Sequence, residues 1–235
     1  MISITLISDT HNRHRDLPGI GSGDIILHAG DATSRGRGHE IEDFLYWYGN
    51  LDFDKKVLVA GNHDFGFEER PEVFADMCGA YGVHYLNDSG VTYRSIKIWG
   101  SPVQPTFHDW AFNRSPTAIQ PHWDKIPYNA DILITHGPAY GILDASQRDE
   151  RVGCPRLLKR IQEVQPRLHV CGHIHEARGH YTKGHTTYIN AASLDRYYEP
   201  YPLNPYKVLW QDGEIVLDSS PQPQHLCPSD QAAVC

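Results

Sequence analysis

Five short apolar runs, each followed directly by polar or turn residues, constrain the fold of this 235-residue chain more than any other feature of its sequence. The runs cover residues 2–7, 25–28, 57–60, 132–135 and 168–171. Short runs rich in β-branched residues are typical of strands that are covered on both faces. We therefore expect a sheet that lies between other layers of the fold.

Helical patterns lie between these runs. Residues 39–51 place apolar side chains on one helical face. Residues 71–81 and 155–164 both begin with proline, which is favoured at the first position of a helix, and Pro166 lies just beyond the second of them. Alternation of strands with helices predicts an α/β layered fold.

The remaining strand signals have an antiparallel character. Residues 91–99 alternate between apolar and polar side chains after a turn predicted at residues 88–90. Residues 186–189 form a further strand candidate, and residues 207–210 and 214–217 flank a hairpin turn. We therefore expect mixed sheets, with the later strands building a second one.

Composition sets the expected domain organisation. Hydrophobic residues make up 40% of the chain, which suits one globular domain over residues 1–218. Residues 219–235 are polar and without periodicity, so we expect a disordered tail. No stretch approaches the ~18 unbroken apolar residues of a membrane helix, and the amino-terminal residues resemble a strand more than a signal peptide. We expect a cytoplasmic protein with no membrane partner.

Cysteine usage and charge exclude further classes. The five cysteines form no C-x-x-C pair, which argues against a disulfide framework and against a cysteine zinc site. The formal net charge of −8 argues against polymeric nucleic acid as substrate or partner, because proteins that bind it carry basic surfaces. Histidine is the outlier: its 15 residues compare with 21 lysines and arginines together, and it is the commonest metal ligand. The oligomeric state stays open.

Each apolar run delivers a metal-binding or proton-transferring side chain where it ends, which is where layered α/β folds bind ligands. The residues are Asp9, His11, Asp31, Asn62, His63, His136, His173 and His175. Imidazole, carboxylate and amide groups without cysteine suit Mn, Fe, Zn, Co or Ni better than a structural zinc. In an extended segment, residues i and i+2 face the same way, so the D-x-H and H-x-H pairs can each converge on one centre.

These motifs, in this order, resemble the calcineurin-like metallophosphoesterases. The family pattern is present as Asp9-Thr10-His11, Gly30-Asp31, Gly61-Asn62-His63-Asp64, His136 and Gly172-His173-Ile174-His175. Within the family the chain looks most like the brain-type metallophosphoesterase-domain subgroup of class III phosphodiesterases, through SDTH, HAGD, GNHD, THGPAYGILD and CGHIHE. The resemblance spans residues 1 to about 210.

The resemblance implies a fold and a dinuclear centre. The fold would be a four-layer α/β/β/α sandwich with two mixed sheets flanked by helices. One divalent ion would be held by Asp9, His11, Asp31 and His175, and the other by Asp31, Asn62, His136 and His173, with Asp31 bridging. We expect two divalent transition-metal ions, Mn²⁺ first, with Fe, Zn, Ni and Co as alternatives.

Two neighbouring residues are candidates for proton transfer. His63 follows a predicted ligand without being one, so it could donate a proton to the leaving alkoxide. We expect Asp64 to orient the His63 ring, although a turn or helix-capping role for Asp64 is an equal alternative.

Substrate contacts are expected from two segments. Residues 101–123 form a long connection whose His108, Trp110 and Phe112 could wall a pocket and stack an aromatic group; the alternative is a separate hydrophobic cluster. Arg35 lies in a Gly-flanked loop after Asp31 and could contact a phosphate oxygen, or could simply be solvated.

The subgroup resemblance implies hydrolysis of small organic or cyclic-nucleotide-like phosphodiesters, with a metal-bridging hydroxide as nucleophile. Two alternatives stay open: a phosphomonoesterase at the same site, and a non-catalytic metal-binding interaction scaffold. A metal-dependent C–N hydrolase also uses H-x-H, but such enzymes are barrels, and here H-x-H comes late in the chain.

Overall fold

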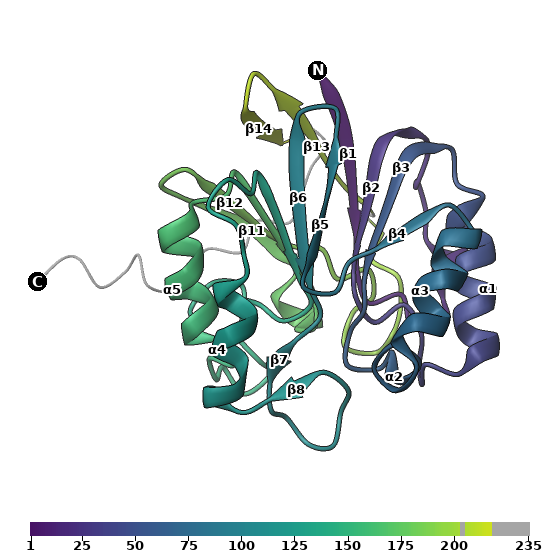
Figure 1. Ribbon diagram of the computed structural model, residues 1–235, viewed down its shortest axis with the longest axis horizontal. Coiled ribbons are helices and arrows are strands. Elements are labelled where there is room, and N and C mark those ends of the chain that lie inside the picture. The colour runs from purple at the N-terminus through teal and green to yellow at the C-terminus, as the bar shows by residue number, and fades with distance from the viewer. Residues whose placement is uncertain (203–204, 218–235) are drawn as a thin grey trace, which may run out of the picture.

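Two six-stranded sheets face each other, and helices cover the outer face of each (Figure 1). This computed structural model describes residues 1–202 and 205–217. The predicted four-layer α/β/β/α arrangement is confirmed. The predicted tail over residues 219–235 lies outside the described residues, and the single domain over residues 1–218 stays a prediction.

The first sheet has the order β14-β13-β1-β2-β3-β4. Its strands are β1 (Ile2–Ile7), β2 (Gly23–Ala29), β3 (Phe53–Val59), β4 (Val83–Tyr85), β13 (Tyr206–Gln211) and β14 (Glu214–Leu217). Strands β1 to β4 run parallel, and the β13–β14 hairpin joins β1 antiparallel. The sheet is therefore mixed, as predicted.

The second sheet has the order β11-β12-β10-β9-β6-β5. Its strands are β5 (Ser89–Tyr93), β6 (Ile96–Ser101), β9 (Ile132–Thr135), β10 (Leu168–Cys171), β11 (Gly179–Lys183) and β12 (Thr186–Asn190). Here β6, β9, β10 and β12 run parallel, and the hairpin partners β5 and β11 are antiparallel. A small sheet pairs β7 (Gln104–Pro105) with β8 (Asn113–Arg114).

Helices cover the two outer faces separately (Figure 1). The first sheet is covered by α1 (Gly38–Gly49), α2 (Phe65–Glu69) and α3 (Pro71–Ala80), and the second by α4 (Pro116–Asp124) and α5 (Pro155–Val164). Two short 3-10 helices, η1 (His14–Asp16) and η2 (His175–Ala177), complete the set.

Unbroken apolar runs are needed because the central strands are buried on both faces. In β2, Ile25 and Leu27 belong to the hydrophobic core between the sheets, whereas Ile26 belongs to the core under α1. In β9, Ile132 and Ile134 likewise face the first core and Leu133 faces the core under α4 and α5. Since side chains alternate along a strand, burial on both faces removes the polar positions that a half-exposed strand would show.

Two sequence expectations were wrong in detail. The turn predicted at residues 88–90 lies slightly earlier: the chain bends at Asn87 and Asp88, and Ser89 already opens β5. A second turn, which was not predicted, lies between Tyr93 and Ile96, with Arg94 in the left-handed region at φ 52°. The alternation of apolar and polar residues continues across this hairpin, so the sequence pattern gives no signal for its turn.

The connection over residues 101–123 is not one long loop. It contains β7, β8 and α4, and α4 begins after Ser115, whose hydroxyl accepts a hydrogen bond from Ala118 N at 3.3 Å. A serine cap followed by Pro116 is a helix-start signal that the sequence analysis did not use.

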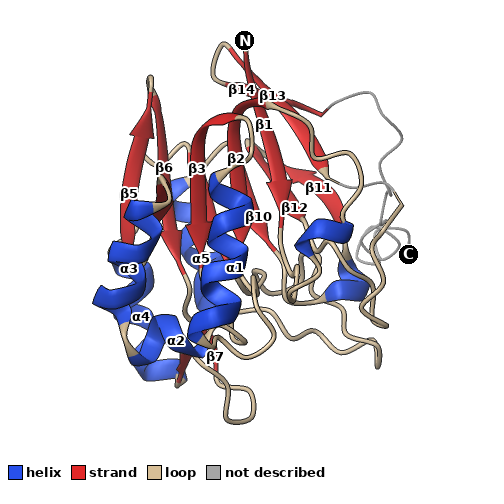
Figure 2. Cartoon of the chain, turned by 90° about the vertical axis from the view of Figure 1, so that its right-hand side faces the viewer, coloured by secondary structure: helices blue, strands red, loops and turns tan. Residues whose placement is uncertain are grey.

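The parallel strands end at one edge of the molecule, where the loops gather (Figure 2). Among the described residues, no helix has both the length and the apolar character needed to cross a membrane.

Candidate metal centre

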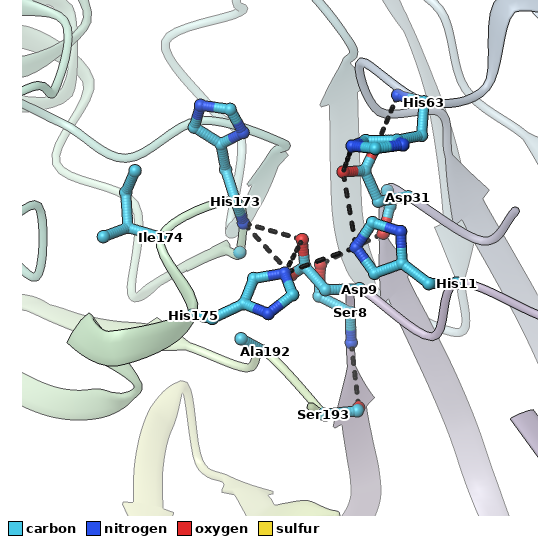
Figure 3. Close-up of polar contacts among 12 residues, drawn as sticks. Ser8, Asp9, His11, Asp31, His63, His173, Ile174, His175, Ala192 and Ser193 are labelled. Carbon is cyan, nitrogen blue, oxygen red and sulfur yellow. Dashed lines mark hydrogen bonds and ion pairs between the residues drawn. The ribbon is translucent and has the colours of Figure 1, made fainter. Parts of the chain in front are cut away.

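The loops after five strands bring the predicted site residues together. Asp9 and His11 follow β1, Asp31 follows β2, and Asn62 and His63 follow β3. His136 follows β9, and the pair His173 and His175 follows β10. Figure 3 shows the side chains of Asp9, His11, Asp31 and His175 facing a common space.

Three overlapping groups of candidate donor atoms form there, and the third of them is His11, Asp31 and His63. The ligand atoms of Asp9, His11 and His175 lie within 4.8 Å of one another, as do those of Asp31, His136 and His173. In the first group, His11 Nε2 lies 3.3 Å from His175 Nε2, which lies 3.5 Å from Asp9 Oδ1. In the second, His136 Nε2 lies 3.4 Å from Asp31 Oδ2 and 2.9 Å from Asn62 Oδ1.

Asp31 lies between the first two groups. Its Oδ2 is 3.4 Å from His136 Nε2 and 3.7 Å from His11 Nε2. Atoms that bind one ion at about 2.1 Å are separated from each other by about 3.0–3.4 Å, so the spacing of Asp31 from His136 fits a shared cation and that from His11 is slightly wider. The donors are nitrogen and oxygen without sulfur, as expected for a transition-metal site.

Backbone carbonyls fix the orientation of three histidines. The Nδ1–H groups of His136, His175 and His63 donate to the carbonyls of Ala29, Asp195 and Ser34, each at 2.9 Å. Because a carbonyl can only accept, Nδ1 carries the proton and Nε2 is left to face the site. Metal-binding histidines are commonly held in this manner.

The strand-end residues are held in unusual backbone conformations. Asp9, His11, Asp31 and His173 have φ values of 54°, 41°, 54° and 68°. The left-handed region is costly for non-glycine residues and is found where surrounding contacts enforce it. One enforcing contact is the backbone N–H of His173, which donates to both carboxylate oxygens of Asp9 at 3.0 Å.

A second enforcing contact holds the bridging candidate. The backbone N–H of His63 donates to Asp31 Oδ1 at 2.7 Å. Glycine is required at position 61, because a Cβ there would collide with the backbone nitrogen and Oδ1 of Asp31. Gly172 is required for the same reason beside Asp9.

Buried charges shift the pKa values within the site. Burial alone would raise the pKa of Asp9, but the hydrogen bond and charge of His175 hold it well below its usual range. Burial alone would lower the pKa of His175 and of His136, but Asp9 and Asp31 raise each to about 9. The carboxylates therefore draw positive charge into the site, and a cation would compete with these protons.

Asp64 does not orient His63. The buried Asp64 carboxylate accepts hydrogen bonds from the backbone N–H groups of Gly61, Ala32 and Thr33 at 2.8, 3.2 and 3.0 Å, and from the Thr33 hydroxyl at 2.7 Å. Burial and the negative charge of Asp31 raise the Asp64 pKa to about 6. Its contacts tie the loop after β2 to the loop after β3, so the orienting role predicted for it is filled by the Ser34 carbonyl.

A cavity of about 540 Å³, named here the metal-side cavity, opens over these residues. Arg35 and Trp110 line it, and the Trp110 ring lies 4.2 Å from the His63 ring, measured between centroids. Phe112 does not line it: the side chain is 2% exposed and belongs to the core under α1. His108 is also absent from the lining and packs on Phe107.

Several lining residues escaped the sequence analysis. They are Gln147, Glu176, Arg196 and Tyr198, and Phe107 also lines the cavity. The Tyr198 ring meets the His11 ring edge-on, with centroids 5.0 Å apart. Phe107 lay inside the predicted pocket segment, but nothing in the local pattern around Tyr198 marked it.

Comparison with known proteins identifies the family. The profile of the calcineurin-like phosphoesterases matches residues 2–177. The chain is 40% identical over 223 residues to human metallophosphoesterase domain-containing protein 1, covering 85% of this chain and 68% of that protein. A UPF0046 protein of Caenorhabditis elegans is 33% identical over 207 residues, covering 83% of this chain and 71% of that protein.

Solved structures agree on the fold. The phosphopantetheinyl hydrolase of Mycobacterium tuberculosis superposes with a TM-score of 0.58 at 16% identity, covering 81% of this chain and 88% of that one. The family is metal-dependent and hydrolyses phosphate esters, and the described residues offer candidate metal ligands at the expected strand ends. This chain therefore belongs to the calcineurin-like phosphoesterase family.

Proposed function

We propose that this chain hydrolyses small phosphodiesters at a centre of two divalent ions. Asp9, His11, Asp31 and His175 would hold one ion, and Asp31, Asn62, His136 and His173 the other. The position of Asp31 carries the proposal, because its Oδ2 lies within 3.7 Å of a histidine nitrogen from each group. When bound, such a pair supplies positive charge to the phosphate oxygens and lowers the pKa of a water.

The residues of the chain would position the ester and move a proton. Arg35 and Arg196 line the metal-side cavity and could donate hydrogen bonds to phosphate oxygens. His63 presents Nε2 to the same cavity, since its Nδ1 is held by the Ser34 carbonyl. That atom would give its proton to the leaving oxygen, and the Trp110 ring beside it would limit its access to water.

His63 has an alternative role that metal analysis can separate. Its donor atom also groups with those of His11 and Asp31, and Nε2 lies 4.0 Å from Asp31 Oδ2. If His63 is the proton donor, His63→Ala should keep two ions per chain and lose about two orders of magnitude in kcat on an unactivated diester. Loss of one ion would instead make His63 a ligand.

The central test measures metal content and turnover together. Purified protein reconstituted with Mn²⁺ should hold close to two ions per chain and cleave bis-p-nitrophenyl phosphate. Parallel reconstitution with Fe, Zn, Ni and Co tests the choice of metal. Two ions without turnover on any ester would favour the non-catalytic scaffold, and one ion or none would contradict the dinuclear centre.

A diester preference is the finer part of the proposal. It follows from the resemblance of the sequence motifs to class III phosphodiesterases, and the aromatic wall that Phe107 and Trp110 give the metal-side cavity would accommodate a second ester group. The ratio of kcat/KM for bis-p-nitrophenyl phosphate to that for p-nitrophenyl phosphate tests it. A ratio below one would favour the phosphomonoesterase alternative.

We further propose a single domain over residues 1–218 and a cytoplasmic location. Limited proteolysis should release one stable fragment that ends near residue 218. Cell fractionation of the full chain tests the location, and recovery in a membrane or secreted fraction would contradict it.

A further inference from the structure

A second cavity adjoins the metal-side cavity. Its volume is about 640 Å³, and it is lined by residues before and within α1 and by residues of α2 and its carboxyl end. Three arginines, Arg35, Arg37 and Arg70, line it, with Glu69 as the one acidic lining residue. We call it the arginine cavity.

These three arginines differ from several others of the chain in their pairing with carboxylates. Elsewhere, arginines pair with carboxylates: Arg13, Arg15, Arg114, Arg151 and Arg160 each lie within 3.0 Å of one. Among the residues that the structure describes, Arg35, Arg37 and Arg70 form no salt bridge, and Arg70 lies over the Phe74 ring at 5.0 Å. Three unpaired guanidinium groups around one hollow create a local positive potential on a chain whose net charge is −8.

The two cavities share a boundary. Arg35 lines both of them. Phe65 lines the arginine cavity, and its ring lies 5.8 Å from the ring of Trp110, which lines the metal-side cavity. A molecule bound at the candidate metal centre can therefore extend past Arg35 and the Phe65–Trp110 pair into the arginine cavity.

We propose that the substrate is a small phosphodiester that carries a second phosphate group, which Arg35, Arg37 and Arg70 bind. This inference rests on the proposed function. The planar guanidinium group donates paired hydrogen bonds that match phosphate oxygens, which explains arginine rather than lysine at all three positions. Hydrolysis adds one water across the scissile P–O bond, giving an alcohol and a phosphate monoester, and leaves the second phosphate unchanged.

Two chromogenic esters that differ by one phosphate provide the test. They are thymidine 5′-(p-nitrophenyl phosphate) and the same compound with a 3′-phosphate. With Mn²⁺-loaded wild-type protein, the 3′-phosphate should raise kcat/KM about tenfold or more, mainly through KM. Arg37→Gln/Arg70→Gln should bring the ratio of the two kcat/KM values close to one. Arg156→Gln/Lys159→Gln, the same charge change on exposed residues of α5, should keep the wild-type ratio.

A binding measurement provides a readout that does not depend on turnover. Calorimetry should show thymidine 3′,5′-bisphosphate binding about tenfold more tightly than thymidine 5′-phosphate, and the arginine double variant should lose this difference. Equal binding and equal turnover of the paired compounds by wild-type protein would overturn the inference while leaving the proposed function intact. Failure to cleave either ester would count against the proposed function itself.

A polymer would give a different result. If the second phosphate belonged to a nucleic acid strand, a single-stranded oligonucleotide would be cleaved far faster than the 3′-phosphorylated ester, and lengthening it would increase the rate further. That outcome would overturn the assignment to a small substrate. A cleavage rate that does not increase with oligonucleotide length would support the assignment to a small substrate.

Discussion

Aromatic residues two positions apart in the same loop have different roles. Trp110 lies against the His63 ring and lines the metal-side cavity, whereas Phe112 is buried in the core under α1. Trp110→Ala should raise KM for an aromatic ester several-fold more than for an alkyl ester, with little change in stability, because it removes a stacking surface. Phe112→Ala should reduce the free energy of unfolding by about 3–5 kcal/mol. Steady-state kinetics and urea denaturation check the pair, and a common effect on both properties would contradict the separation.

A single buried carboxylate joins two loops of the candidate site. Asp64 Oδ2 accepts from the N–H groups of Gly61 and Ala32, and its Oδ1 accepts from the N–H and hydroxyl groups of Thr33. In Asp64→Asn, an NH2 group would face two N–H donors, so we expect a loss of about 1–3 kcal/mol in unfolding free energy. We also expect weaker Mn²⁺ binding, since the loops carry Asp31 and Asn62.

Denaturation of the metal-free protein at pH 7.5 measures the first effect and calorimetric titration with Mn²⁺ measures the second. Thr33→Val, which removes one donor to Asp64 together with the acceptor of the Gly36 N–H, is the comparison and should show a smaller change in Mn²⁺ binding. Wild-type stability in Asp64→Asn would show that the loops do not depend on this carboxylate.

At the scale of elements, a helix of five residues positions the pocket wall. Glu68 in α2 accepts hydrogen bonds from Phe112 N and from Arg114 Nη1, both at 2.9 Å. These bonds anchor the loop that carries Trp110. Glu68→Gln retains one hydrogen-bond acceptor, whereas Glu68→Ala removes both and should free the loop. We therefore expect Glu68→Ala to raise KM for an aromatic ester several-fold and to leave the metal content at the wild-type value. Glu72→Gln, at an exposed position of α3, serves as the control and should change neither quantity.

The same elements show where sequence patterns are sufficient and where they are not. Strands β1, β9, β10 and β14 have the predicted bounds, because burial or simple alternation fixes their residue types. The turn inside residues 91–99 was missed, since Arg94 supplies a left-handed conformation without the glycine or asparagine that usually marks one.

The site residues also fall into those that a sequence pattern can predict and those that it cannot. Asp9 and Asp31 follow the neighbouring parallel strands β1 and β2 of the first sheet, and His136 follows β9 of the second, so the ends of parallel strands place them at one edge of the molecule. Tyr198 and Arg196 reach the metal-side cavity from a loop whose path is set by tertiary contacts: Ser193 N donates to the Ser8 carbonyl at 2.8 Å. The hydrophobic periodicity of the sequence cannot predict such tertiary contacts.

At the scale of the whole molecule, the buried histidines make stability depend on pH. His169 in β10 lies between the layers, with Nε2 2.9 Å from the Thr135 hydroxyl, and burial lowers its pKa to about 3 from an ordinary value of 6.5. Between these pH values the unfolded chain binds a proton here that the folded chain does not. The free energy of unfolding therefore rises with pH across this window. The contribution of His169 is fully present above about pH 6.5 and decreases by about 1.4 kcal/mol for each pH unit below it.

Replacing His169 with glutamine should remove this contribution, because the amide keeps a donor for the Thr135 hydroxyl and does not titrate. The difference in unfolding free energy between wild type and His169→Gln, measured on metal-free protein at pH 7.5, 6, 5 and 4.5, should shift progressively in favour of the variant as pH falls. His39→Gln changes an exposed histidine and should follow the wild-type curve. If the free energies of unfolding of wild type and His169→Gln changed in parallel with pH, the folded protein would accept a proton at His169. The layers around β10 would then have to admit water.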